Sequence, residues 1–200
     1  MTLLMLPLVL NAQAQQVHTG SPKPRSEAED FHADKVEMSV ESANLFDTGN
    51  RNYYHLAPQI LSLRWQLDDV GNPGWRRGNT EWVFSGYYTP VISGPESRFT
   101  GALFGPRYNF VQPGWKWVPY IDSRVGFGFT DSRGVTGAQG QDFCFTFSVG
   151  AGARYILSDT VDLSAGVLYQ HFSNAGLSEP ARENHGLDAI GPNVALHFKF

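Results

Sequence analysis

Apolar residues recur at every second position through most of this chain, and this pattern limits the possible folds more than any other feature. Successive side chains of a β-strand point to opposite faces, so a repeat of two predicts strands that each have one apolar face. A continuous series of such strands predicts an all-β protein. The segments with this pattern, two of them weaker than the rest, are 36–46, 61–67, 82–92, 98–111, 116–129, 143–155, 161–173 and 188–200.

The other face of these strands carries glycine, serine and charged residues. A soluble barrel of the lipocalin type would bury its apolar face and turn its charges to water, and it is the alternative fold. Small residues mixed with Arg, Asp and Glu suit the narrow interior of a small outer-membrane barrel, filled by paired charges. The charged residues expected to pair in this interior are Glu37, Glu41, Arg64, Arg107, Asp122, Arg124 and Arg154.

Aromatic residues lie near the strand ends on the apolar face, as the interfacial girdles of membrane barrels require. Trp117, Tyr155 and Tyr169 are examples. The chain closes on PNVALHFKF, whose alternation and terminal Phe200 resemble the C-terminal assembly signal of outer-membrane barrels. We therefore predict an eight-stranded antiparallel transmembrane β-barrel of the bacterial outer membrane over residues 36–200.

The first residues predict export. Residues 1–14 form a short apolar segment that ends in Ala12-Gln13-Ala14, the pattern of a signal peptide cleavage site, although no basic residue precedes the segment. The missing basic residues indicate a start site further upstream. Polar residues 15–35 are expected to be a flexible lead-in.

One connection of the predicted barrel does not fit this topology. Residues 68–80 lie where a short periplasmic turn is expected, and this segment is too long for such a turn.

Composition excludes several other classes of function. The net charge is -4 and no cluster of Lys or Arg supplies a footprint for phosphates, so nucleic acid is not an expected partner. The single cysteine, Cys144, excludes an internal disulfide and a cysteine-based zinc cluster. The expected partners are the lipids of the outer membrane, and a second copy of the chain is a candidate partner.

One strand end carries a pair of residues that can perform chemistry. His171 and Ser173 share the outward parity of segment 161–173, about 7 Å apart along it. Polar side chains that face hydrocarbon are unfavourable, so the pair needs a reason. A histidine at this spacing can act as the general base of a serine nucleophile. The candidate ligands of the oxyanion are the amide groups that follow, together with the Asn174 side chain: Asn174, Ala175 and Gly176.

A third group usually orients such a base. Asp188 has the outward parity of the last segment, 188–200, which should run antiparallel to the segment with His171. Glu183, in the loop between them, is the second candidate. The alternation of faces favours Asp188.

The stretch HFSNAGLSEP at 171–180, the following Gly186-Leu187-Asp188 and the apolar last strand resemble the lipid A 3-O-deacylase (PagL) family of outer-membrane acyl hydrolases. The resemblance covers residues 171–200 and implies that His171 is the base and Ser173 the nucleophile. In that family the acidic residue is a glutamate in a P-x-x-G-x-E pattern. Here Pro180 is followed by ARENHGLD, so Asp188 matches only after a short insertion.

The resemblance also implies a reaction. A serine esterase of this family removes the ester-linked 3-hydroxyacyl chain at the 3-position of lipid A, without a metal or another cofactor. Lipopolysaccharide would be the substrate. Two other classes of function remain open on the sequence: a non-catalytic barrel with a structural or adhesive role, and a narrow channel for small apolar solutes, against which the lumenal charges count.

Overall fold

The computed structural model describes residues 31–49 and 53–200. The predicted signal peptide and most of the lead-in lie outside them. The strands are β1 (Val36–Ala43), β2 (Leu45–Asp47), β3 (His55–Leu56), β4 (Gln59–Gln66), β5 (Gly78–Ser93), β6 (Arg98–Phe110), β7 (Trp117–Thr130), β8 (Phe143–Ile156), β9 (Val161–Ser173) and β10 (Leu187–Lys199).

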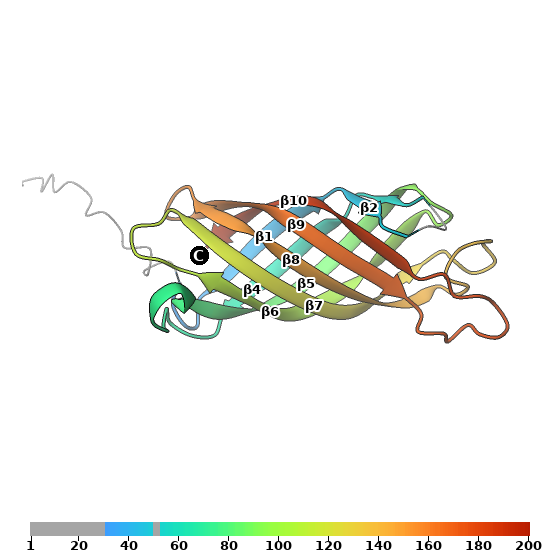
Figure 1. Cartoon of the computed structure of the whole chain (residues 1–200), viewed down its shortest axis with the longest axis horizontal. Helices are drawn as coiled ribbons and strands as arrows, with labels where there is room; N and C mark the ends of the chain where they lie inside the picture. Colours follow the sequence, from blue (N-terminus) through green and yellow to red (C-terminus); the bar gives the residue numbers. More distant parts are fainter. Residues whose placement is uncertain (1–30, 50–52) are drawn as a thin grey trace, which may run out of the picture.

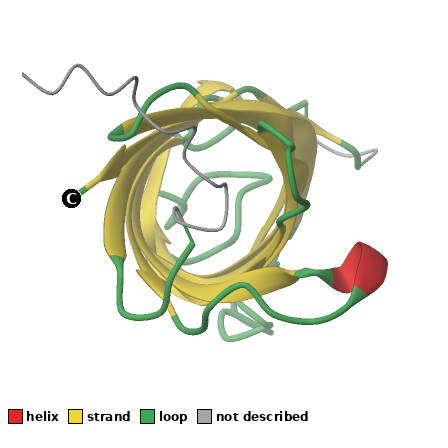
Figure 2. Cartoon of the chain, turned by 90° about the vertical axis from the view of Figure 1, so that its left-hand side faces the viewer, coloured by secondary structure: helices red, strands yellow, loops and turns green. Residues whose placement is uncertain are grey.

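These segments form a closed barrel of eight antiparallel strands, which confirms the predicted fold (Figures 1 and 2). Asn44 alone separates β1 from β2, and Ala57 with Pro58 separates β3 from β4, so each pair acts as one strand. Closure comes from β1, which pairs with β4 on one side and with β10 on the other. Every strand pairing in the barrel is antiparallel.

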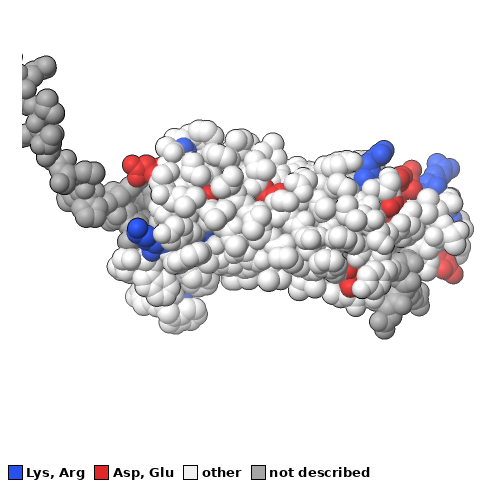
Figure 3. Space-filling view, turned by 90° about the horizontal axis from the view of Figure 1, so that it is seen from above, with Lys and Arg blue, Asp and Glu red and all other residues white. Residues whose placement is uncertain are grey.

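The apolar face of the strands is the outer wall, as the alternation predicts. On β9, Leu163 and Val167 are 40% and 50% exposed, whereas Asp162 and Ser164 are buried in the lumen. Figure 3 shows a middle band nearly free of charged side chains, with Lys, Arg, Asp and Glu gathered toward the two ends. Within the two described ranges, no helix is long and apolar enough to span a bilayer.

The half of the lumen near the C-terminus is filled by ion pairs, as the charges on the inner face predict. Arg154 pairs with Glu37 and Asp162 at 2.8 and 2.6 Å. Arg64 pairs with Glu81 at 2.6 Å, and all five of these side chains are buried. Each of these buried cations therefore meets a carboxylate, as a stable buried charge requires.

The half of the lumen remote from the C-terminus differs from the prediction of a polar interior. An apolar cluster fills it, including Leu45, Leu56, Phe99, Leu168 and Phe172, none of which is exposed. The rings of Phe99 and Phe172 stack with centroids 4.4 Å apart. The barrel is therefore closed by charges at one end and by a hydrocarbon core at the other.

The end of the barrel that carries the C-terminus has short connections at 111–116 and 157–160. The loop predicted at 68–80 is found at residues 67–77 and contains a short 3-10 helix, Gly74–Arg76, that projects to the side of the barrel (Figure 2). Phe31, within the predicted lead-in, is buried beside Val111 and Val118. The longer loops 131–142 and 174–186 lie at the opposite end, which is the extracellular end in barrels of this kind.

Candidate active site

The pairing of β9 with β10 brings His171 and Asp188 together on the outer wall. The two residues are direct partners in the strand register. His171 Nδ1 donates to Asp188 Oδ1 over 2.8 Å. Both side chains are partly exposed, at 35% and 44%. A carboxylate bonded to Nδ1 leaves Nε2 of the neutral ring as the acceptor, which is the tautomer that a general base requires.

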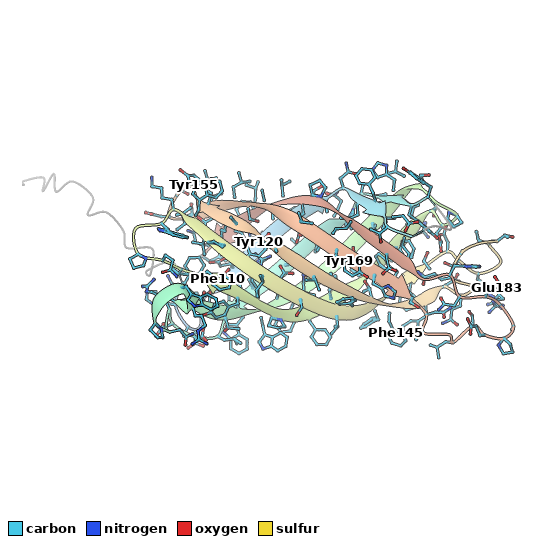
Figure 4. The ribbon with its side chains drawn as sticks, in the orientation of Figure 1. Phe110, Tyr120, Phe145, Tyr155, Tyr169 and Glu183 are labelled. Atoms are coloured by element: carbon cyan, nitrogen blue, oxygen red, sulfur yellow. The ribbon has the colours of Figure 1, made fainter. Side chains whose placement is uncertain are left out.

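Tyr169, two residues before His171 on β9, joins this pair. Its hydroxyl donates a short hydrogen bond to the same Asp188 oxygen. We expected Tyr169 in the aromatic girdle, and nothing in the alternation distinguishes it from a girdle residue. Figure 4 shows it on the outer wall, with Glu183 in the loop beyond the strand ends. Asp188 is therefore held by two donors, both from the neighbouring strand.

Ser173 is the last residue of β9, on the same face as His171. Its Oγ accepts hydrogen bonds from Asn184 Nδ2 at 3.0 Å and from the Ala175 amide at 3.2 Å. Within the described residues no hydrogen bond joins it to His171. Such a bond is often long in a structure without substrate and tightens in the complex.

Both side chains do lie close to Gly186 in the following loop. A methyl group added at Gly186 would lie 3.6 Å from His171 Cε1 and 3.7 Å from Ser173 Cβ. A β-carbon at Gly186 would thus be in van der Waals contact with both side chains, which places His171 and Ser173 on one patch of the outer wall.

Of the three residues expected to bind an oxyanion, the structure directs one toward Ser173 and gives the other two different partners. The Asn174 side chain is buried, and its amide donates to Gln139 O and, over 2.9 Å, to Ser178 Oγ. It points away from Ser173, which corrects the expectation for this side chain. The Gly176 amide is bonded to Asn174 Oδ1 at 2.9 Å. Only the Ala175 amide, in a turn with a φ of 55°, points to Ser173.

Asn184 supplies the donor that the sequence did not reveal. Its side-chain amide donates to Ser173 Oγ, and its Oδ1 accepts from the main-chain N–H of Asn174 at 3.4 Å. Asn184 lies in a loop with no alternation, so the sequence gives no direction for its side chain. A polar side chain eleven residues after the serine was the only signal.

Glu183, the second candidate for the acid, lies elsewhere. Its Oε2 is 3.0 Å from His185 Nε2, and its side chain is 86% exposed. It has no hydrogen bond to His171 among the described residues. The geometry therefore favours Asp188 as the partner of this histidine.

Aromatic and aliphatic side chains flank the site on the lipid-facing wall. Phe145 is the register partner of Ser173, and Phe147 is the partner of His171. Both phenylalanines are exposed, as is Ile190 on β10. These side chains offer an apolar surface on both sides of the polar group, which suits an ester that carries hydrocarbon chains.

A buried carboxylate outside the site braces the loops around it. Glu96, between β5 and β6, accepts from Ser132 Oγ at 2.8 Å and from the Gln139 amide at 3.3 Å. It also accepts a short bond from the Tyr54 hydroxyl, and burial together with this bond raises the pKa of Tyr54. Gln139 in turn binds Asn174. Glu96 is thus linked to the turn that follows Ser173.

No cluster of three or more His, Cys, Asp or Glu side chains is placed to hold a metal ion in the described part of the chain. Direct hydrogen bonds join His171, Asp188 and Tyr169 in one group, and Ser173, Asn184 and the Ala175 amide in another.

The family model for lipid A 3-O-deacylase (PagL) matches residues 59–197, which is more than half of the chain and includes His171, Ser173, Asn184 and Asp188. The chain belongs to the PagL family. The resemblance seen in the last strands is thereby confirmed. The family and the barrel fold place the protein in the bacterial outer membrane.

Solved structures agree with the fold expected for a PagL family member. The crystal structure of the outer membrane enzyme PagL is 22% identical, with a TM-score of 0.54, and the match covers 80% of this chain and 97% of that chain. Neisserial surface protein A is 15% identical, with a TM-score of 0.55 and coverage of 82% and 97%. The N-terminal barrel of Pseudomonas aeruginosa OprF is 14% identical, with a TM-score of 0.53 and coverage of 84% and 98%. Curated protein sequences give no match.

Proposed function

We propose that this protein is a serine esterase that removes the ester-linked 3-hydroxyacyl chain from the 3-position of lipid A. The observation that carries this proposal is the hydrogen-bonded pair of His171 and Asp188 on the lipid-facing wall, on the same face and strand end as Ser173. Family membership supports the reaction and the substrate class. The position on the outer wall lets a membrane lipid approach without leaving the leaflet.

The reaction begins with attack by Ser173 Oγ on the ester carbonyl carbon, while its proton passes to His171 Nε2. Asp188 accepts Nδ1–H and stabilises the imidazolium that forms. The oxyanion receives hydrogen bonds from the Asn184 side chain and the Ala175 amide, both of which already point to Ser173. His171 then returns the proton to the departing sugar oxygen. Water, activated by the same histidine, releases the fatty acid from Ser173.

The main alternative is a barrel with a structural or adhesive role. Such a protein has no need for an imidazole–carboxylate pair beside a hydroxyl in its lipid-facing wall, where polar groups are unfavourable. A channel for apolar solutes is opposed by the lumen, which ion pairs and the apolar cluster fill.

The test replaces the nucleophile. We expect Ser173→Ala to abolish removal of the 3-hydroxyacyl chain, as measured by mass spectrometry of lipid A from cells that carry each form. Ser123→Ala is the matched control, because Ser123 is a serine on the outer wall of β7, away from the site. Equal lipid A patterns with the wild-type protein, with Ser173→Ala and without the protein would reject the proposal.

A further inference from the structure

A second set of polar side chains faces outward near β1 to β4. Gln59 Nε2 donates to Ser42 Oγ at 2.9 Å, and His55 Nε2 donates to Asn44 Oδ1 at 2.5 Å. We call these four residues, Ser42, Asn44, His55 and Gln59, the polar patch. Their inward neighbours Leu45 and Leu56 are fully buried, so the strand alternation turns Asn44 and His55 to the outer wall.

The polar patch continues the row of side chains that begins at the candidate active site. Tyr169 is the register partner of Ile190, and Ile190 is the partner of Phe46. Phe46 is the partner of His55, and the two rings stack with centroids 4.7 Å apart. Neighbouring strands are about 4.8 Å apart, so three strand spacings place His55 roughly 15 Å around the wall from β9.

A groove of about 520 Å³ lies beside the polar patch. Ala57, Ile92, Pro192 and Val194 supply apolar lining, while Asn44 and His55 supply polar groups. The groove is widened by the small side chain of Ala57. Its walls belong to β10 and to the strands that follow the row from the active site, so it opens onto the same lipid-facing surface.

The chemistry of the groove matches an acyl chain with a polar group near its head. The apolar lining suits hydrocarbon. The ring Nδ1 of His55 has no partner among the described residues, and with Nε2 donating to Asn44 it is an acceptor for a hydroxyl or an amide N–H. A lipid with one chain cannot occupy the active site and this groove together, whereas a lipid with several chains can.

We propose that this groove binds a second acyl chain of the same lipid, with His55 and Asn44 bonded to the polar group of that chain, while Ser173 attacks the first. The inference rests on the proposed function for its substrate class. It makes the groove a determinant of specificity for lipids that carry several acyl chains. Polar side chains in the outer wall, which are otherwise unfavourable, then gain a partner in the complex.

The test measures binding in the Ser173→Ala background, so that it does not depend on turnover. Ala57→Trp fills the groove, and His55→Phe keeps the ring stack but removes the polar atoms. We expect each to weaken binding of hexa-acylated lipid A in detergent micelles about tenfold, and to leave binding of a single-chain 3-O-acyl glucosamine unchanged. Ser123→Trp, which intrudes on a different groove of the outer wall, is the matched control and should alter neither.

Two results would overturn the inference. Unchanged affinity for hexa-acylated lipid A in both variants would leave no role for the groove in binding substrate. A shift from dimer to monomer in sedimentation, with lipid affinity unchanged, would assign the groove to a second copy of the chain. Hydrolysis of lipid A by the protein with intact Ser173 is measured separately and tests the proposed function. The binding assay tests the groove, so failure of one proposal can be distinguished from failure of the other.

Discussion

Asp188 determines which nitrogen of His171 can accept a proton. Its carboxylate receives hydrogen bonds from His171 Nδ1 and the Tyr169 hydroxyl. We expect Asp188→Asn to lower kcat for ester hydrolysis by at least about 10²-fold, because an amide can favour the wrong tautomer. Hydrolysis by detergent-purified protein gives the measurement. Asp188→Glu, which keeps the acid, should retain more activity than Asp188→Asn.

Glu183→Gln is the control for the choice of acid. Glu183 is bonded to His185 and largely exposed, so its loss should leave kcat within about twofold of the wild type. If Glu183→Gln were the damaging change and Asp188→Asn the harmless one, the assignment of the acid would be reversed.

Asn184 is the residue whose role the structure adds to the sequence. Its side-chain amide is 3.0 Å from Ser173 Oγ, close to where the oxyanion of an attacked ester would form. Loss of one such donor lowers kcat by about 10²–10³-fold. We expect this loss for Asn184→Ala, with KM nearly unchanged, in steady-state assays. A change confined to KM would show that Asn184 binds the ground state instead.

The outward placement of three site residues could be predicted, and that of the fourth could not. His171, Ser173 and Asp188 lie on strands, where a period of two fixes the face of each side chain. Asn184 lies in the loop before β10, where no period applies. The inward turn of Asn174 continues the alternation of β9, in which Phe172 also faces inward, and its partner Gln139 belongs to another loop.

At the scale of elements, the loop 131–142 supports the turn after β9. Glu96 binds Ser132 and Gln139 in this loop, and Gln139 binds Asn174. Both oxygens of the Glu96 carboxylate accept hydrogen bonds. In a glutamine, one of these oxygens is replaced by an NH₂ group, which cannot accept a bond from the donor that faces it. We therefore expect Glu96 to act as a positioning residue for Ser173, through Gln139 and Asn174.

We expect Glu96→Gln to lower kcat by roughly 10- to 100-fold while the barrel still assembles, because small displacements of a nucleophile have effects of this size. Hydrolysis of a single-chain ester gives kcat and KM separately. Glu179→Gln, an exposed change in loop 174–186, is the control. A normal kcat in Glu96→Gln, or a rise in KM alone, would show that the loop brace does not reach the nucleophile.

The strands themselves were predictable from alternation, but the filling of the lumen was predictable only in part. Inner-face charges such as Arg64 and Arg154 stand out in the sequence and pair as expected. Leu168 and Phe172, also on the inner face, make β9 apolar on both sides near its outer end. A period of two cannot show whether such side chains meet one another across a lumen.

At the scale of the whole molecule, buried ion pairs join neighbouring strands from inside the lumen. Asp162 on β9 accepts from Arg154 Nε at 2.7 Å and from Lys199 Nζ at 2.9 Å, and it is fully buried. Removal of one partner of a buried pair costs about 3–5 kcal/mol. We expect Asp162→Asn to lower the free energy of unfolding by about 3 kcal/mol, measured by urea titration in lipid vesicles. The exposed change Glu183→Gln should alter it by less than about 0.5 kcal/mol.

An equal stability of Asp162→Asn and the wild type would mean that the lumenal pairs contribute no net stabilisation. The assay of ester hydrolysis provides an independent check, because Asp162 faces the lumen and the site faces the membrane. Folded Asp162→Asn protein should therefore retain its kcat.

The site stands on the outside of a sealed cylinder, so neither reactant nor product has a route through the protein. In the proposed reaction, substrate arrives by lateral diffusion, and the freed fatty acid and the shortened lipid depart sideways into the same monolayer. Encounter is thus a two-dimensional event. The rate of encounter depends on the fraction of neighbouring lipid that is substrate. The concentration of substrate per volume of surrounding water does not affect it.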